Sequence, residues 1–317
     1  MGKIKSIICL GAGDGQLRII RLIRSMGYRS IVIDQNKNSV GFDISDEILN
    51  ISTFDYLPVI KKLKVLELKY EYLCVMARVT GPALYTASMI SELFKIPGPS
   101  KELVKLSLKK SDLRNHCKRF NFLVPAGHKI NSDNSEITNL ELPLIIKPNS
   151  TIIGKKSIRI INQESIYKSS LKDACSISYD DYAEVQSFVD GIDVSTLVYC
   201  DKGKAKIICS WDEFIGIDEL GYIKGLGVGT PSVIKNKDIE LKIHALIKEF
   251  VSKLKKTSYF IIFSFRITFK NEIYIIELHS DLGGDLITEH LIARSNKKFD
   301  FFRMVIQSML DKNIKNK

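Results

Sequence analysis

The sequence predicts an α/β domain with a parallel sheet, followed by an α+β region. Over residues 1–99, apolar runs of strand length alternate with amphipathic helical stretches, which is typical of a parallel sheet covered by helices. After residue 100, several short strand-like runs follow one another, and only a few helical stretches separate them. These two observations set the fold class.

Composition indicates an ordinary globular protein. At 317 residues the chain is long enough for two or three domains, and its 45% hydrophobic and 26% charged residues are typical of folded proteins. No apolar run reaches the ~20 residues of a membrane helix, and the apolar stretch after Lys5 is too short for a signal peptide. None of the six cysteines forms a C-x-x-C pair, which favours reduced thiols over zinc ligands or disulfides. We therefore expect a cytoplasmic protein with no membrane partner.

The formal net charge of +11 raises the question of a nucleic-acid partner. The lysines are spread along the chain, whereas nucleic-acid proteins more often concentrate basic residues on one element with aromatic residues between them. We favour a solvated lysine-rich surface and expect no nucleic-acid partner. The same charge would suit anionic substrates.

Strand and helix patterns alternate through residues 1–99. Apolar runs predict three buried strands, and in the helical stretches apolar residues recur beside arginines and lysines. The strands are expected within 4–13, 29–36 and 72–78, and the helices within 14–28, 56–70 and 81–98.

Residues 100–125 predict one long basic helix that stops near Asn121. Ser100 is its expected N-cap, and Glu102 lies in its first turn. Further along, a hairpin is expected around Lys270-Asn271. The other expected strands lie within 142–148, 156–162 and a meander over 182–189, 193–200 and 204–211, and the other helices within 237–256 and 298–313.

A glycine turn follows the first predicted strand. Gly11, Gly13 and Gly15 are spaced almost as in a dinucleotide-binding fingerprint, and Asp34 ends the second strand about where such a fingerprint has its acidic residue. The third glycine comes one residue early, and Gln16 stands in its place. Two interpretations remain open here: an NAD site, or a turn that joins strand to helix, with Asp34 capping a loop.

Four later blocks, taken in order with this opening, resemble the ATP-grasp superfamily. They are "KKSDLRNHCKRFNFLVP", "LPLIIKPNSTIIGKKSI", "VQSFVDGIDVS" and "FIIFSFRITFKNEIYIIELHSDLGGD", and the opening "LGAGDGQLRIIRLIRSMGYRSIVIDQN" resembles the first domain of the purine-pathway carboxylate ligases. The resemblance implies a Rossmann-like domain over 1–99, a linker helix and small subdomain over 100–182, and a second subdomain over 183–317. The two subdomains would clamp ATP between them.

The first two blocks imply contacts to the nucleotide phosphates. By resemblance, Lys110 would touch the phosphates, and Gly154 and Lys155 would belong to a loop over the triphosphate. Lys147 ends an apolar strand, so its ammonium needs a polar destination, and an α-phosphate or an adenine nitrogen would provide one. The alternatives are a solvated lysine at 110 and a basic hairpin tip around Gly154.

The third block implies contacts to the nucleoside. Gln186 stands where the family usually has a glutamate that accepts from the adenine amino group, and an amide oxygen can still accept that bond. Backbone groups of Ser187 and Val189 would meet the purine edge, and Asp193 would take the ribose side. The alternative for Asp193 is an exposed hairpin residue.

The fourth block implies a Mg²⁺ site that departs from the family pattern. Glu277 matches the second of two acidic residues, and a carboxylate that ends an apolar strand is costly to bury unless it is paired or metal-bound. Ser264 occupies the first acidic position, or Phe265 does if the hairpin is one residue shorter. His279 replaces an asparagine and Asp281 replaces an arginine. In one interpretation, His279 and Asp281 help Glu277 to hold Mg²⁺ while Arg266 or a lysine supplies positive charge. In the other, metal binding is weakened, and activity is lost or altered.

The resemblance implies an ADP-forming ligase that activates a small-molecule carboxylate as an acyl phosphate, which an amine then attacks. Its ligands would be ATP and Mg²⁺, with Arg266 and Asp281 as catalytic candidates. The acceptor would bind between the first domain and the last region, beside the turn at 11–15. A silent ATP-binding protein and an NAD-dependent dehydrogenase are the alternatives. The sequence does not fix the oligomeric state, but superfamily members are often dimers, so the resemblance leaves a homodimer open.

Overall fold

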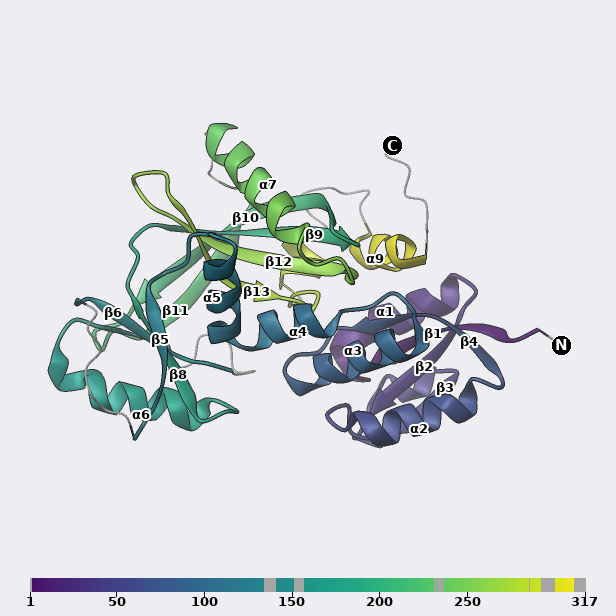
Figure 1. Cartoon of the computed structure of the whole chain (residues 1–317). Coiled ribbons are helices and arrows are strands. Elements are labelled where there is room, and N and C mark those ends of the chain that lie inside the picture. The colour runs from purple at the N-terminus through teal and green to yellow at the C-terminus, as the bar shows by residue number, and fades with distance from the viewer. Residues whose placement is uncertain are drawn as a thin grey trace.

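The computed structural model describes residues 2–133, 141–150, 157–230, 232, 237–284, 286–291 and 300–310. It contains three sheets, which Figure 1 shows as one parallel sheet near the N-terminus and two antiparallel sheets built from the rest of the chain. Among the described helices, none is long and apolar enough to cross a membrane.

The first sheet has the strand order β3-β2-β1-β4, and its pairs are parallel, as predicted. Its central strands are buried on both faces, which explains their near-continuous apolar sequences. The short strand β3 was not predicted. The elements are β1 (Ile4–Leu10), α1 (Asp14–Ser25), β2 (Arg29–Asp34), the short helix η1 (Phe42–Ile44), β3 (Glu47–Asn50), α2 (Tyr56–Leu66), β4 (Tyr70–Ala77) and α3 (Pro82–Phe94).

The region predicted as one long helix forms two. α4 (Lys101–Leu108) and α5 (Lys110–Arg119) are separated at Lys109, whose backbone is extended, with φ −124° and ψ 114°. The helix breaks because the Lys110 amide donates to the Asn149 carbonyl at 3.0 Å instead of continuing the α4 pattern. The predicted N-cap is confirmed, since the Ser100 hydroxyl accepts from the Leu103 amide at 3.2 Å.

The second sheet is small and antiparallel, with the order β5-β8-β6-β7. The predicted meander is wrong at its first strand, because β8 pairs with β5 and β6 and not with the strands that follow it. The predicted domain boundary at 182/183 falls at the start of β8, and the three domain ranges remain predictions. The elements are β5 (Gly127–Asn131), β6 (Leu144–Pro148), β7 (Arg159–Ile161), η2 (Glu164–Ile166), α6 (Tyr167–Ile177) and β8 (Tyr182–Ser187).

The third sheet is antiparallel, with the order β11-β10-β9-β12-β13. The predicted hairpin around Lys270-Asn271 is present between β12 and β13. β11 was not predicted. The elements are β9 (Ile192–Asp201), β10 (Lys204–Ile217), β11 (Ile223–Gly229), α7 (Lys237–Val251), β12 (Ser258–Ile267), β13 (Ile273–His279), the π-helix η3 (Leu286–Leu291) and α9 (Phe301–Leu310).

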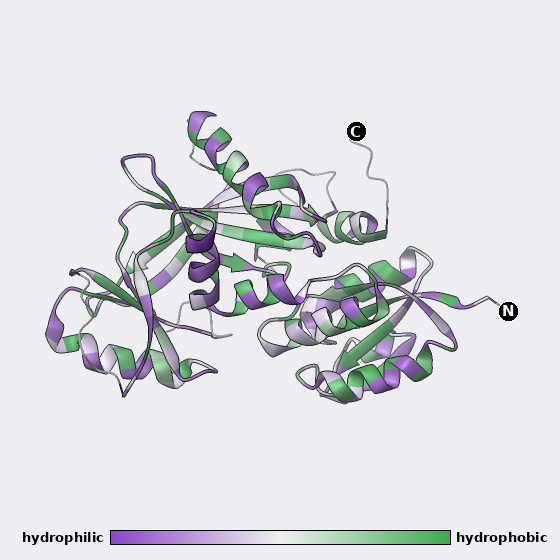
Figure 2. Ribbon diagram, viewed as in Figure 1, coloured by the Kyte–Doolittle hydropathy of each residue, from purple (hydrophilic) through white to green (hydrophobic). Residues whose placement is uncertain are grey.

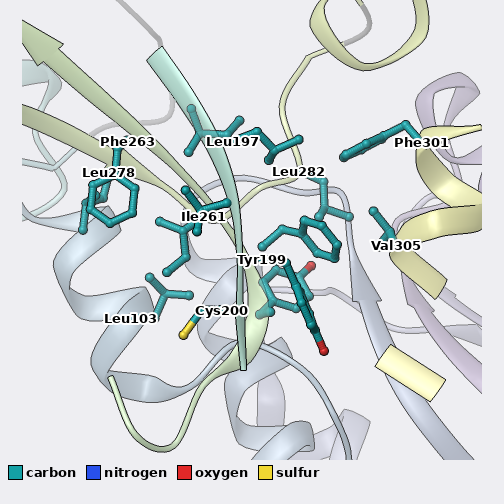
Figure 3. Close-up of a cluster of buried hydrophobic side chains, with 14 of the residues drawn as sticks. Leu103, Leu197, Tyr199, Cys200, Ile261, Phe263, Leu278, Leu282, Phe301 and Val305 are labelled. Atoms are coloured by element: carbon teal, nitrogen blue, oxygen red, sulfur yellow. The ribbon is translucent and has the colours of Figure 1, made fainter. Parts of the chain in front are cut away.

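One apolar cluster joins the first sheet to the third. It includes Ile7 of β1, Leu103 of α4, Phe263 of β12 and Phe301 of α9, all of them buried. Figure 3 shows part of this cluster, with Leu103 beside the strands of the third sheet and Phe301 on α9. In Figure 2, the strands of the first sheet are mainly hydrophobic, whereas hydrophobic and hydrophilic residues alternate along helices such as α2 and α7. This shared core holds the first and third sheets together, and the third sheet supplies part of the candidate site.

Candidate functional site

A cavity of about 280 Å³ is lined by the two antiparallel sheets and by residues of α3, α4 and α5. One wall is apolar and is formed by isoleucines of the two antiparallel sheets, among them Ile145, Ile215 and Ile223. Thr80, in the connection between β4 and α3, lines it as well. The predicted site residues that line the cavity are Lys110, Lys147, Asp193, Arg266, Glu277, His279 and Asp281.

Lys110 and Glu277 form an ion pair in this cavity, with 3.0 Å between the Lys110 ammonium and Glu277 Oε1. A β-bulge in β13 helps to place Glu277 there, because the extra residue Ile276 separates the Ser264–Glu277 pair from the next pair in the ladder. Burial raises the pKa of Glu277, but the charges of Lys110 and His279 outweigh it and lower the pKa to about 2. The carboxylate is therefore ionised at neutral pH.

Lys147 is buried, and its side chain lines the same cavity. Its ammonium has no hydrogen bond or ion pair with any residue that the structure describes. Burial and the nearby Lys110 lower the pKa of Lys147 to about 8, although Glu277 and Glu184 oppose that shift. A buried cation of this kind attracts an anionic ligand.

Gln186 lies on β8 directly opposite Ile145 of β6, so both side chains lie on the same face of the second sheet. Its amide nitrogen donates to Glu184 Oε1 at 3.3 Å, and its Oε1 is buried without a partner in the described part of the chain. Glu184 is fully buried and forms an ion pair with Arg114 of α5. Since an ionised carboxylate only accepts hydrogen bonds, Glu184 fixes which way the Gln186 amide faces.

Asp193 and Arg266 are neighbours across β9 and β12 and form a bidentate pair, with both N···O distances at 2.7 Å. A third guanidinium nitrogen donates to the Val189 carbonyl at 2.9 Å. The Ser187 amide donates to the Ala126 carbonyl at 2.9 Å. The Arg266 contacts hold Val189, in the β8–β9 connection, against the third sheet, whereas the Ser187 bond ties the end of β8 to Ala126. The predicted nucleoside roles of these residues remain predictions.

The predicted metal ligands are not assembled into a three-residue site. Glu277 and His279 are adjacent, with 3.7 Å between Oε2 and Nε2, whereas one Asp281 oxygen accepts from the Gly283 amide at 3.0 Å. Within the described ranges, no group of three or more His, Cys, Asp or Glu side chains could hold a metal ion. Mg²⁺ commonly takes one or two protein carboxylates plus phosphate oxygens and waters. The residues present therefore fit a nucleotide-bound Mg²⁺ at Glu277 and do not fit an all-protein metal cage.

Ser264, at the position where the family has its first acidic residue, joins a short hydrogen-bond chain. Its hydroxyl lies 3.0 Å from the Ser195 hydroxyl, and Ser195 donates to Glu213 Oε1 at 2.5 Å. Glu213 also lines the cavity and was not singled out from the sequence. The sequence did offer a signal for Glu213, which is a charged residue inside the run "SWDEF". It offered a similar signal for Glu184, inside "YAEVQ".

The glycine turn at 11–15 was expected beside the acceptor site, but none of its residues lines this cavity. Asp34 binds the turn itself, accepting from the Ala12 amide at 2.8 Å and the Asn36 amide at 2.9 Å. Gln16 packs against Gly11 and donates to the Arg78 carbonyl at 2.6 Å. These contacts favour the structural interpretation of Asp34. Gly154 and Lys155 lie outside the described residues.

The same architecture occurs in solved structures of known enzymes. A phosphoribosylglycinamide synthetase from Anaerococcus prevotii superposes with a TM-score of 0.69 at 20% identity, over 98% of this chain and 76% of its own. An L-amino acid ligase from Bacillus licheniformis gives 0.74 at 15% identity, over 98% and 75%. A complex of biotin carboxylase with β-γ-ATP from Campylobacter jejuni gives 0.75 at 17% identity, over 99% and 72%.

This chain has the ATP-grasp fold. No protein-family model matches its sequence. The structural likeness extends over nearly the whole chain, so the parallel sheet and the two antiparallel sheets are all part of that fold. At these identities the likeness concerns the fold alone.

Proposed function

We propose that this ATP-grasp chain is an ADP-forming ligase that joins a small-molecule carboxylate to an amine. The observation that carries the proposal is the convergence of Lys110, Lys147 and Glu277 on one cavity with an apolar wall. The wall suits a purine base, and the two ammonium groups suit its phosphates. The names of the solved neighbours, which include a synthetase and a ligase, support this class of reaction.

In the proposed reaction, an oxygen of the substrate carboxylate attacks the γ-phosphorus of ATP. The bond from that phosphorus to the bridging oxygen breaks, and ADP and an acyl phosphate form. The amine then attacks the carbonyl carbon and loses a proton, and phosphate leaves. Lys110 and Lys147 hold the phosphates, so the protein contributes mainly position and charge. Mg²⁺ bound with ATP neutralises phosphate charge, and Glu277 is the residue that would hold it.

Trapping the intermediate tests this proposal without knowledge of the amine. Hydroxylamine replaces the amine and converts any acyl phosphate into a hydroxamate, so only the carboxylate needs to be screened, with Mg-ATP present. We expect equal amounts of ADP and hydroxamate with at least one carboxylate, and neither product from the Glu277→Ala variant. ADP without hydroxamate would contradict the acyl-phosphate step.

A silent ATP-binding protein is the second candidate, and Ser264 favours it. The serine brings no charge to the first acidic position, where it hydrogen-bonds to Ser195. ATP binding without ADP formation across the carboxylate screen would select this candidate over the ligase. The cytoplasmic location and the homodimer both stay predictions from the sequence.

A further inference from the structure

The start of α5 is set by a residue of another element. The Lys110 amide donates to the Asn149 carbonyl at 3.0 Å, and the Ser111 amide donates to Asn149 Oδ1 at 2.9 Å. The next two amides, of Asp112 and Leu113, donate to the Lys109 carbonyl. The first four amides of the helix therefore have protein partners, and Asn149 supplies the first two. The place where α5 begins, and with it the Lys110 side chain, depends on Asn149.

Asn149 is itself held rigidly. It is fully buried, its amide donates to the Tyr182 carbonyl at 3.0 Å, and its Nδ2 donates to Asp180 Oδ2 at 2.8 Å. The other Asp180 oxygen accepts from the Ser178 hydroxyl at 2.9 Å and the Ser150 hydroxyl at 3.1 Å. Asp180 thus fixes the Asn149 side chain, since a carboxylate only accepts and the amide nitrogen must face it.

Two lysine ammonium groups lie near Asp180, and the nearer one helps to keep it charged. Lys129 lies 3.0 Å from Asp180 Oδ2, and Lys109, the residue at the break between α4 and α5, lies 3.7 Å from the same atom. Burial raises the pKa of Asp180, but Lys129 and the hydroxyl donors outweigh it and lower the pKa. Because Lys109 stands between α4 and α5, its contact with Asp180 links the helix break to this carboxylate.

The network links the two lysines of the cavity. Lys147 is a residue of β6, and Asn149 follows that strand directly. Lys147 is therefore placed by the strand, and Lys110 is placed by Asn149, at the end of the same strand. The positions of both ammonium groups therefore depend on β6, although the two lysines come from segments that are distant in the sequence.

We propose that Asn149 and Asp180 are positioning residues that fix the spacing of the two phosphate-binding lysines. Neither residue lines the cavity, so they act through Lys110. The inference rests on the proposed function, because it takes ATP phosphates as the ligand of both lysines. It assigns to Asp180, which lies between α6 and β8, an effect on triphosphate binding but not on binding of the nucleoside.

A side-chain swap separates this role from a general effect on folding. Asn149→Asp keeps the acceptor for Ser111 but places two carboxylates against each other, which should tilt or loosen the start of α5. Adding Asp180→Asn reverses donor and acceptor and restores the bond, since the new amide can donate to the new carboxylate. Asp180→Asn alone can still accept from Asn149, so it should cost less than Asn149→Asp.

ATP and adenosine binding by isothermal titration calorimetry give the readout. We expect Asn149→Asp to weaken ATP about tenfold, with adenosine nearly unchanged, and the double variant to recover most of the ATP affinity. Near-natural ATP affinity in Asn149→Asp would overturn the inference. So would weak ATP binding by a folded double variant that still binds adenosine normally, and this second result decides the matter even if Asn149→Asp does not fold. If the natural protein binds no ATP, the proposed function fails first and this inference fails with it.

Discussion

The Lys110 ammonium lies 3.0 Å from Glu277 Oε1, so the first helix after the helix break and the last strand of the third sheet meet as an ion pair inside the cavity. Each partner has a second use in the proposed reaction. The ammonium can turn to a phosphate, and the carboxylate can turn to the Mg²⁺ that accompanies it. While no nucleotide is bound, the ion pair therefore lets the charges of Lys110 and Glu277 compensate each other.

Glu277→Ala is expected to abolish ATP turnover, by at least about a hundredfold, while the fold survives. The variant removes the carboxylate that fits Mg²⁺ and leaves Lys110 without its counter-ion. Turnover is measured as ADP release, and folding by thermal unfolding and circular dichroism. Glu272→Ala is the matched control, since Glu272 is an exposed glutamate next to the same strand. Full activity in Glu277→Ala would remove the metal assignment.

The titration of Lys147 is expected to change both stability and ATP binding at alkaline pH. As the pH rises, stability should increase and ATP affinity should decrease. Its pKa falls from 10.5 to about 8 on folding. The unfolded chain therefore holds more protons between those values, and stability should rise with pH across that window as the cost of burying the charge is relieved. ATP affinity should fall above about pH 8, because the neutral amine no longer attracts phosphate.

Lys147→Met tests both signs, because methionine fills similar space without a charge. Near pH 7 the variant should be more stable than the natural protein, by up to about 3 kcal/mol, and the difference should shrink towards pH 10. Its ATP affinity should be low at every pH. Chemical denaturation and ATP titration at several pH values measure these effects, and a constant stability difference would refute the pKa shift.

Gln186 is expected to select a 6-amino purine. Its buried Oε1 has no partner in the described part of the chain, and Glu184 holds the amide nitrogen on the other side. ATP offers an amino group to that oxygen, whereas inosine triphosphate offers a carbonyl. Gln186→Leu should weaken ATP about tenfold and leave inosine triphosphate nearly unchanged, which competitive binding would show. Gln163→Leu, at an exposed glutamine, is the control. An unchanged preference for ATP would place the base elsewhere.

Ser264→Asp is expected to strengthen the dependence on Mg²⁺. The new carboxylate would stand opposite Glu277 in the ladder, so the two charges should repel each other and lower stability without metal. Mg-ATP should then stabilise the variant more than it stabilises the natural protein, as thermal unfolding with and without chelator would show. Ser264→Ala controls for loss of the bond to Ser195. An identical response of all three proteins would mean that the metal does not lie near Ser264.

The sequence predicted those parts of the fold that depend on local pattern. Buried runs such as that of β1 and the polar turn at Lys270-Asn271 produced the expected strands and hairpin. The break at Lys109 was not predictable, because it depends on a hydrogen bond from Lys110 to Asn149, far along the chain. The placement of β8 beside β6 likewise depends on strand pairing between distant segments, which periodicity does not report.

The sequence predicted those site residues whose charge costs free energy to bury without a partner. Lys147 and Glu277 stood out because each ends an apolar strand, and the structure brings both to the cavity. Asp193 and Arg266 were named singly, and only the β9–β12 register reveals that they form a pair. Glu184 could have been noticed as a charged residue inside "YAEVQ", but nothing local indicated that it contacts Gln186 and Arg114. No local pattern indicated the contacts of Asp180.

Thermal unfolding of the natural protein with Mg-ATP, with ATP plus chelator and with NADH tests the central claim most directly. A ligand at 100 times its dissociation constant stabilises a protein by about 2.7 kcal/mol, which amounts to a shift of a few degrees. We predict a clear rise in melting temperature with Mg-ATP, a smaller rise once the metal is chelated and none with NADH. No shift with Mg-ATP at millimolar concentration would contradict the assignment of the cavity to ATP.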